Sequence, residues 1–535
     1  AGNVISGNTI TGLTIGAPNA QVLNNTIGYN AARTAALPNG VGGIAFSGAT
    51  AASAIVGAPG QGNLIAGNTG VGVLVASGTG EGNAIRFNRI FGNSGLGLDL
   101  KGNGVSVNDG LRETGVNQMI DQPVITSSIV TGTGATTKLF VMGYVGSAAG
   151  QTTFGNVNVD LYVSDGDASG YGEGSLWLGT VVTDANGNFR STINLSTNPI
   201  APGTKLTATA TDAAGNTSEF GAIATATAGV GGTVFEDVNY GGGAARNWTT
   251  AQASGGKAVA GATVEIYNQG SGAFVARTTT DATGSYLLPT AAPGFYNVRV
   301  VSASVISSRT PSSTGLVPVP TLRSSSTGGT TIQITDQVGG PTPGAADVPA
   351  NAASANWSAL QVSASAQPTA WASVEVPASM VSVGSVDFGF NFDLVVNKND
   401  AGQGSLRQAI TNANYLNADS ALAQVGRPAG IENLIFMLAD GTARAGLAST
   451  LPSQFSGGVA SIALQSALPT ITTTMAIDAQ AQPGWTLAPL VEVSGTGLPA
   501  GTNGLSITAS GTVVRGLVIN RMPTAGIAIS GVGAS

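Results

Sequence analysis

The sequence predicts an all-β protein of several domains that is built around a parallel β-helix. Three observations lead to this fold class. A short phrase of glycine, asparagine and apolar residues recurs through the first 125 residues, strand-length apolar segments separated by turn residues fill most of the remainder, and a single convincing helix is present. At about 150 residues per domain, the 535 residues suffice for roughly three or four domains.

Residues 1–125 carry the repeated phrase. It occurs as Gly2-Asn3-Val4-Ile5, as Gly62-Asn63-Leu64-Ile65 and as Gly82-Asn83-Ala84-Ile85. Repeats of this length without a helical period indicate a solenoid of short strands with Ile, Val, Leu and Phe inside. Asparagine tolerates tight bends, and asparagines in register can bond from coil to coil as a ladder; plain turn chemistry is the alternative explanation.

The middle of the chain predicts two β-sandwich domains. Short strands such as Val157-Asn158-Val159-Asp160-Leu161-Tyr162-Val163, separated by turns such as Asp184-Ala185-Asn186-Gly187, predict a sandwich over residues 126–228. A second small β domain is expected over 229–302. Residues 303–392 are rich in Ser, Thr, Ala and Pro, and we expect a linker or an extended excursion with a few edge strands.

Residues 393–535 begin with the one convincing helix. Ser405 is a suitable N-cap, and Leu406, Ala409 and Ile410 fall on one face of the helix. Strand patterns resume at Leu434-Ile435-Phe436-Met437 and continue to the end of the sequence.

Several segments resemble modules of bacterial surface proteins. The stretch Asn399 to Ile410 resembles the opening cap of secreted right-handed parallel β-helix proteins, and Asn25-Thr26-Ile27-Gly28 is similar to a later coil of that family. The resemblance implies that 393–535 holds a cap helix with the N-terminal half of the β-helix, and that 1–125 is its C-terminal half. The β-helix is then right-handed and split between the two ends of the chain.

The middle segments resemble two further modules. Ala210 to Phe220 resembles bacterial Ig-like domains, and Val234-Phe235-Glu236-Asp237-Val238-Asn239 looks like a collagen-adhesin or serine-aspartate-repeat B-type domain. Collagen-adhesin B-type domains often carry a Lys–Asn isopeptide bond, but this first strand has no Lys, so we expect no such crosslink. The resemblance implies export and an extracellular or cell-surface location on a bacterium, with adhesion or scaffolding as the role.

Composition excludes several function classes. The net charge of −7 and the absence of Lys or Arg blocks make nucleic acid and anionic membranes poor partners, and no apolar run reaches the roughly 18 residues of a membrane span. The sequence has no Cys and no His, which excludes disulfides, thiolate metal sites and a Ser-His-Asp triad. We therefore expect no enzymatic activity, and carboxylate-based hydrolysis of a polysaccharide is the enzymatic alternative.

One loop of the first sandwich is a candidate calcium site. The candidate ligands are Asp165, Asp167, Ser169 and Glu173. Their alternation, with Gly170 at the sixth position, resembles the first part of an EF-hand loop, whereas the twelfth position holds Leu176 in place of a bidentate Glu. Ca²⁺ is the one cofactor that we consider, and a solvated hairpin loop without metal is the alternative.

The order of the modules predicts assembly. The helix cap lies late in the chain, and reading Gly526-Ile527-Ala528-Ile529-Ser530 through Ser535 into Ala1-Gly2-Asn3-Val4-Ile5 continues the solenoid phrase. We expect an extracellular structural protein that forms a fibre or surface layer by head-to-tail stacking of copies, either as tandem repeats or as separate subunits. A surface adhesin that binds glycan or host protein is the first alternative, and a polysaccharide-active enzyme is the second.

Overall fold

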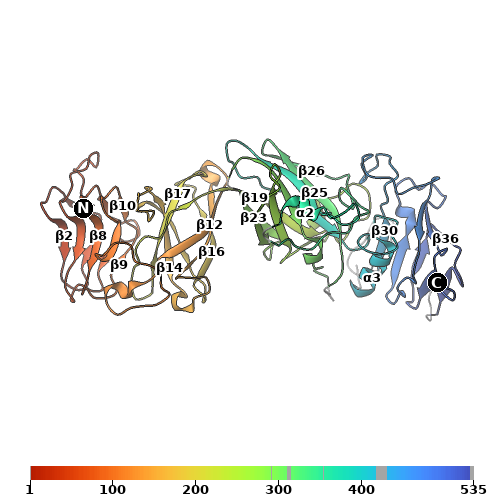
Figure 1. The fold of residues 1–535 in the computed structure, drawn as a ribbon, viewed down its shortest axis with the longest axis horizontal. Helices are drawn as coiled ribbons and strands as arrows, with labels where there is room; N and C mark the ends of the chain where they lie inside the picture. Colours follow the sequence, from red (N-terminus) through yellow and green to blue (C-terminus); the bar gives the residue numbers. More distant parts are fainter. Residues whose placement is uncertain (1, 291, 310–314, 353–354, 417–429, 531–535) are drawn as a thin grey trace. The chain divides into compact units, whose positions relative to one another are not determined.

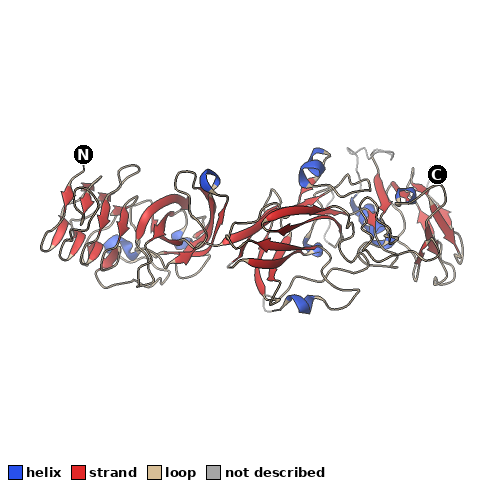
Figure 2. Ribbon diagram, turned by 90° about the horizontal axis from the view of Figure 1, so that it is seen from above, coloured by secondary structure: helices blue, strands red, loops and turns tan. Residues whose placement is uncertain are grey.

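The computed structural model describes residues 2–290, 292–309, 315–352, 355–416 and 430–530, and nearly all of its regular structure is β-strand (Figures 1 and 2). The chain divides into two compact units, Ala1–Ala228 and Gly229–Ser535. Within the described ranges, no helix has the length and apolar character that crossing a membrane requires.

The first unit begins with three parallel sheets through which the chain passes in turn; we call them the N-terminal stack. One sheet has the order β1 (Val4–Ile5), β4 (Thr26–Ile27), β7 (Leu64–Ala66), β10 (Arg89–Phe91). The second is β2 (Thr11–Ile15), β5 (Gly42–Phe46), β8 (Val71–Ala76), β11 (Leu98–Lys101). The third is β3 (Gln21–Val22), β6 (Ile55–Val56), β9 (Ala84–Ile85).

Apolar side chains at equivalent positions of successive strands fill the interior of the N-terminal stack. Ile27 pairs in register with Ile65, and Ile65 pairs with Ile90; the first two are fully buried and Ile90 is 2% exposed. The expectation that apolar residues of the repeated phrase lie inside is therefore confirmed for Ile65. The recurring phrase places one apolar residue per coil at this level, which is why the three sheets enclose an apolar core.

Two antiparallel sheets complete the first unit and enclose a second core, in the region where a β-sandwich was expected. One is β12 (Pro123–Thr131), β13 (Lys138–Val145), β16 (Asn188–Asn194). The other is β15 (Gly174–Val182), β14 (Asn158–Ser164), β17 (Lys205–Thr211), β18 (Ala224–Thr225). Leu139, Val159 and Leu206 are fully buried in this core because alternate residues of the strands face inward.

The second unit begins with a ten-stranded sheet. Its main path is β20 (Lys257–Ala258), β19 (Ala228–Glu236), β28 (Phe388–Asn391), β25 (Val319–Thr327), β27 (Trp371–Val376), β24 (Gly294–Val300), β21 (Thr263–Asn268), β22 (Phe274–Thr279). Off this path, β23 (Ser285–Thr290) pairs with β19 and β26 (Thr330–Ile334) pairs with β25.

The expectation of a linker or extension over residues 303–392 is wrong. Strands β25, β27 and β28 from this segment lie inside the ten-stranded sheet, and β28 pairs with β19 in parallel. Ser, Thr and Pro dominate the composition, but apolar residues such as Leu322, Val374 and Phe388 are buried at the inward positions. A boundary at residue 302 is not a domain boundary here, because β27 pairs with β24 and β28 pairs with β19, and both partners lie before it in the sequence.

Residues 394–529 form a second set of parallel sheets, the C-terminal stack. One sheet is β29 (Leu394–Val395), β30 (Glu432–Phe436), β32 (Met475–Asp478), β35 (Val513–Arg515). The second is β31 (Ala460–Ala463), β33 (Val491–Ser494), β36 (Leu517–Asn520), and the third is β34 (Leu505–Ile507), β37 (Ile527–Ile529).

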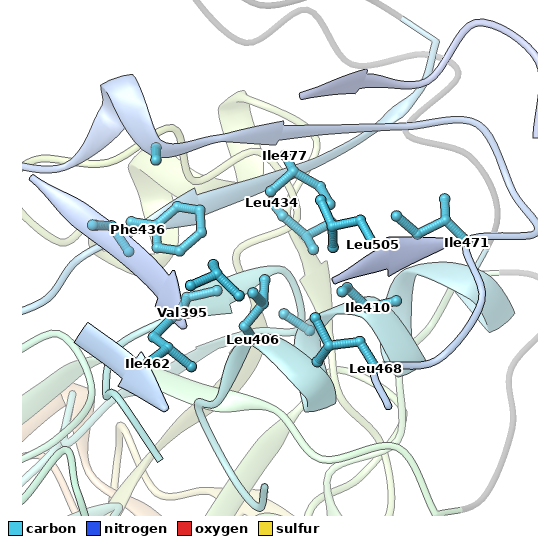
Figure 3. Close-up of a cluster of buried hydrophobic side chains, with 14 of the residues drawn as sticks. Val395, Leu406, Ile410, Leu434, Phe436, Ile462, Leu468, Ile471, Ile477 and Leu505 are labelled. Atoms are coloured by element: carbon cyan, nitrogen blue, oxygen red, sulfur yellow. The ribbon is translucent and has the colours of Figure 1, made fainter. Parts of the chain in front are cut away.

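The predicted helix is confirmed as α3 (Leu406–Leu416), which lies at the β29 end of the C-terminal stack. The Ser405 hydroxyl accepts a hydrogen bond from the Gln408 backbone N–H at 3.2 Å, as an N-cap should. Leu406 and Ile410 belong to the buried cluster inside the stack, where Leu406 lies near Val395 and Ile410 lies near Leu468 (Figure 3). The helix thus closes the core at the start of this stack.

Short helices occur in the connections. The short α-helices are α1 (Trp248–Ala253) and α2 (Trp357–Leu360). The 3₁₀ turns are η1 (Val116–Met119), η2 (Gly134–Thr136), η3 (Thr152–Phe154), η4 (Ser302–Ser304) and η5 (Ala479–Ala481).

Candidate functional site

Asparagine ladders run along the N-terminal stack, as the recurring phrase predicts. In the first ladder the side-chain amides of Asn3, Asn25 and Asn63 donate to the Oδ1 atoms of Asn25, Asn63 and Asn88, at 3.0, 3.1 and 2.9 Å. The backbone N–H of each donor residue bonds the same oxygen. Every rung therefore has the same polarity: Nδ2 faces the next coil and Oδ1 faces the preceding one.

The second ladder ends on a carboxylate of the β-sandwich. The amides of Asn8, Asn39 and Asn68 donate to the Oδ1 atoms of Asn39, Asn68 and Asn93, each at 2.8 Å. The Asn93 amide then donates to Glu173 Oε1 at 2.8 Å, and the Asn93 backbone N–H donates to Glu173 Oε2 at 2.9 Å. A hydrogen-bond chain of this polarity needs a final acceptor, and the two carboxyl oxygens of Glu173 supply it.

Other side chains of the sandwich accept the N–H groups at the same end of the N-terminal stack. Glu219 accepts from the Leu100 N–H at 2.8 Å, Thr217 accepts from the Ile85 N–H at 3.0 Å, and the Tyr162 hydroxyl accepts from the Phe87 N–H at 3.2 Å. A stack that ended here without partners would leave strand edges open. The sandwich therefore caps this end, a role that no local sequence pattern indicates for Glu219, Thr217 or Tyr162.

A buried ion pair strengthens this cap. Arg86 donates from Nε and Nη2 to the two carboxylate oxygens of Asp160, at 2.5 and 2.9 Å, and the Asp160 side chain is fully buried. Such a two-point pair fixes the angle between its partners as well as their separation. Arg86 is therefore a structural contact between the N-terminal stack and the sandwich.

Burial changes the acid–base behaviour of the ladder's last residue. Burial raises the pKa of Glu173 to about 9, the neighbouring Asp165 carboxyl adds to the rise, and the hydrogen bonds from Asn93 oppose it. Burial also raises the pKa of Glu219. Glu173 is therefore protonated at neutral pH and can donate toward Asp165 while it accepts from Asn93.

The candidate calcium ligands have protein partners in the structure. Asp165 accepts the Gly92 N–H at 2.9 Å, Asp167 accepts the Ser169 N–H at 2.7 Å, and the Ser169 hydroxyl donates to the Tyr171 carbonyl at 2.9 Å. Glu173 belongs to the ladder. Across the described ranges, no group of three or more acidic, His or Cys side chains is arranged to hold a metal ion. Calcium binding at this loop stays a prediction.

Acidic residues of the C-terminal stack, which the polysaccharide-hydrolase alternative invokes, sit beside arginines. Asp478 accepts from Arg515 at 2.9 Å, and Glu492 accepts from Arg521 at 2.5 Å. Hydrogen bonds from Ser461 and Asn520, together with the Arg521 charge, lower the pKa of Glu492. A glycosidase general acid needs a raised pKa, so these contacts do not favour that role for Glu492.

The outer end of each stack has strands that pair on one side only within the described residues. At the start of the N-terminal stack these strands are β1, β2 and β3, and at the finish of the C-terminal stack they are β35, β36 and β37. Apolar side chains are open to solvent at both ends: Val4 is 46% and Ile10 67% exposed, and Ile527 is 40% and Ile529 52% exposed. Exposed strand edges beside apolar residues are surfaces for further strand pairing.

Comparison with known proteins identifies the first part of the ten-stranded sheet. The family model of the SdrD B-like domain matches residues 228–333, from β19 into β26. This match confirms the B-type resemblance expected for residues 229–302 and extends it beyond them.

Among solved structures, the chain is similar to the BSP domain of a biofilm-associated protein, with 13% identity and a TM-score of 0.16 over 34% of this chain and 27% of that one. It is also similar to BcpA, the major pilin subunit of Bacillus cereus, with 10% identity and a TM-score of 0.13 over 40% and 67% of the two chains. The T6 backbone pilin of Streptococcus pyogenes is similar with 12% identity and a TM-score of 0.12, over 38% of this chain and 54% of that one. The chain thus spans about a quarter of the first of these proteins and about half of the third.

Proposed function

We propose that this chain is a unit of an extracellular structural protein of a bacterial surface, in which the two stacks are halves of a right-handed parallel β-helix that join head to tail. The observation that carries the proposal is the pair of open stack ends. The match to the SdrD B-like domain supports a surface location, since the resemblance to such modules implies export. The partner is an equivalent unit, which follows in the same chain or belongs to a separate subunit.

The direction of the strands supports joining these two ends. In both stacks each new coil is added on the side away from the previous one, so the open side of β35–β37 accepts a following coil and the open side of β1–β3 accepts a preceding coil. Joining them continues one parallel solenoid with no reversal of strand direction. The contact is heterologous, so it can repeat along a filament.

The residue pattern gives the register of the join. Gly526-Ile527-Ala528-Ile529 corresponds to Gly12-Leu13-Thr14-Ile15, and Leu517-Val518-Ile519 corresponds to Asn3-Val4-Ile5 with the same offset. Stacking β37 on β2 in this register places Ile529 above Ile15. The exposed apolar residues at both ends would then enter one continuous core.

The ladder polarity also supports a preceding coil. Each Oδ1 in the ladders accepts from the coil before it, and Asn3 and Asn8 are the first rungs. Both are exposed, and within the described residues no donor reaches their Oδ1 atoms. A coil docked against β1 and β2 would supply the missing donors.

A designed disulfide tests the join. The chain has no native Cys, so Thr14→Cys together with Ala528→Cys introduces the only two thiols. Stacked strands lie roughly 4.8 Å apart, which is within the Cα separation of a disulfide. We expect mild oxidation of the full chain to give a ladder of disulfide-linked oligomers on non-reducing gels, and elongated particles by electron microscopy.

The matched control is Val182→Cys with Ala528→Cys, because Val182 is 57% exposed on β15, away from the proposed join. It should give little crosslinking at the same concentration. Head-to-tail stacking would be overturned if both cysteine pairs crosslinked equally. It would also be overturned if the Thr14→Cys, Ala528→Cys variant stayed monomeric at concentrations where it forms other intermolecular contacts.

A further inference from the structure

A surface groove of about 270 Å³ lies on the N-terminal stack where it meets the β-sandwich. The turn residues Pro59 and Gly60 form part of its wall, and its functional side chains are Arg33, Phe87, Arg89 and Trp177. The volume lies just below the roughly 300 Å³ at which pockets for drug-sized ligands begin. The groove therefore suits a ring-sized group rather than a folded partner.

Two aromatic rings form one side of the groove. Phe87 and Trp177 meet edge to face, with ring centroids 5.4 Å apart and an interplanar angle of 68°. Trp177 is 37% exposed, so part of its indole is open to the groove. An aromatic face of this kind stacks against flat apolar surfaces, including the C–H face of a sugar ring.

The backbone holds Phe87 in an unfavourable conformation. Its φ is +61°, in the left-handed region, where the equivalent residue of an earlier coil is Asn24 with a φ of +60°. Asparagine tolerates this region, whereas a bulky residue such as Phe is rare there. The fold does not need an aromatic side chain at this turn, and strained residues of this kind concentrate at functional sites.

Two arginines reach the groove without acidic partners. Arg33 donates from Nε to the Thr26 hydroxyl at 2.8 Å, and Arg89 donates from Nε to the Ser175 carbonyl at 3.0 Å. Within the described residues neither guanidinium forms an ion pair, and no carboxylate lines the groove. The terminal Nη groups of both arginines remain available as donors, in contrast to those of Arg86, which pairs with Asp160.

We propose that this groove binds a uronic acid residue of an acidic polysaccharide. The sugar ring stacks on Trp177, and its carboxylate accepts hydrogen bonds from Arg33 and Arg89. Guanidinium groups match the planar geometry of a carboxylate and bind it at two points. The site has a local positive charge in a chain whose net charge is −7, so an anionic ligand is complementary to the groove and not to the protein as a whole. The site does not depend on head-to-tail stacking.

Titration calorimetry of the full chain with tetragalacturonic acid tests the site. We expect saturable binding, at least tenfold weaker binding of the fully methyl-esterified tetramer, and at least a tenfold loss for the Arg33→Gln, Arg89→Gln double variant. Trp177→Ala should lose a similar factor while it keeps all charges. Circular dichroism and the melting temperature establish that each variant is folded.

Arg190→Gln is the matched control, because Arg190 is an exposed arginine of the sandwich that forms no ion pair within the described residues and lies over Phe140, outside the groove. It should bind the acid like the unmodified chain. Three results would overturn the proposal: no saturable binding of the acid, equal binding of its ester, or an equal loss in the Arg190 variant. A sulfated oligogalactoside that binds more tightly than the uronate would overturn the carboxylate assignment.

Discussion

Glu173 of the β-sandwich accepts both the side-chain amide and the backbone N–H of Asn93, at 2.8 and 2.9 Å. It thereby takes the place that the next asparagine would have in a ladder running through the N-terminal stack. A residue of the β-sandwich completes the hydrogen bonding of the N-terminal stack. The stability of the stack therefore depends on the sandwich.

The first prediction concerns the pH dependence of that contact. Glu173 has an ordinary pKa of 4.5 and a folded pKa of about 9, so between these values the folded state holds a proton that the unfolded state has lost. Its contribution to stability is therefore present below about pH 4.5 and is lost as the pH rises through about 9. Because Gln resembles the protonated acid, the Glu173→Gln variant should be more stable than the unmodified chain at pH 8. At pH 5 this gain in stability should be smaller.

Urea unfolding of both chains at several pH values between 5 and 9 measures this difference. Asp167→Asn is the control, since Asp167 is a half-buried carboxylate of the same loop. If the difference in stability between the unmodified chain and the Glu173→Gln variant does not change with pH, the assignment of a protonated Glu173 is contradicted.

The second prediction concerns the interior of the ladder. Asn68→Ala removes a side chain that accepts from Asn39 and donates to Asn93, and all three residues are buried. Each lost buried hydrogen bond costs about 1 kcal/mol, so the loss of one on either side of Asn68 should lower the free energy of unfolding by about 2 kcal/mol. Asn186→Ala, at an exposed turn, should change the same free energy by less than about 0.5 kcal/mol. Equal effects would show that the ladder contributes nothing beyond turn geometry.

The third prediction concerns the core of the N-terminal stack. Ile65 is fully buried, so Ile65→Asp introduces an unpaired charge among apolar side chains and should cost about 3–5 kcal/mol or prevent folding. Ile55 is 39% exposed on the neighbouring β6, and Ile55→Asp should be tolerated. Thermal unfolding compares the two. Similar melting temperatures for both variants would mean that Ile65 does not face the interior of the stack.

The fourth prediction concerns calcium at the loop of Asp165, Asp167, Ser169 and Glu173. If the loop binds Ca²⁺, millimolar calcium should raise the melting temperature of the first unit relative to chelator, through preferential binding to the folded state. An Asp165→Asn, Asp167→Asn variant should lose that response. Identical melting in calcium and in chelator would leave the loop as a hydrogen-bonded hairpin, with Asp165 engaged by the Gly92 N–H.

Features that repeat or act locally follow from the sequence alone. The Asn-apolar phrase predicts the ladders and the buried phase of Ile65, because residues at one phase of a solenoid share one environment. The helix after Ser405 follows from its cap and its apolar face, both of which lie within a few residues. The B-type resemblance likewise rests on a continuous stretch of chain.

Contacts between distant segments follow from the tertiary structure and not from any local pattern. Local spacing places Glu173 in a candidate calcium loop, whereas its ladder partner Asn93 belongs to the N-terminal stack. Residues 303–392 read as a linker because their composition is polar, whereas their strand partners are far away in the sequence. Trp177 and Arg89 are far apart in the sequence, and they line one groove only because the sandwich caps the stack. Local periodicity encodes which face of a strand is buried, but it does not encode which strand lies beside it.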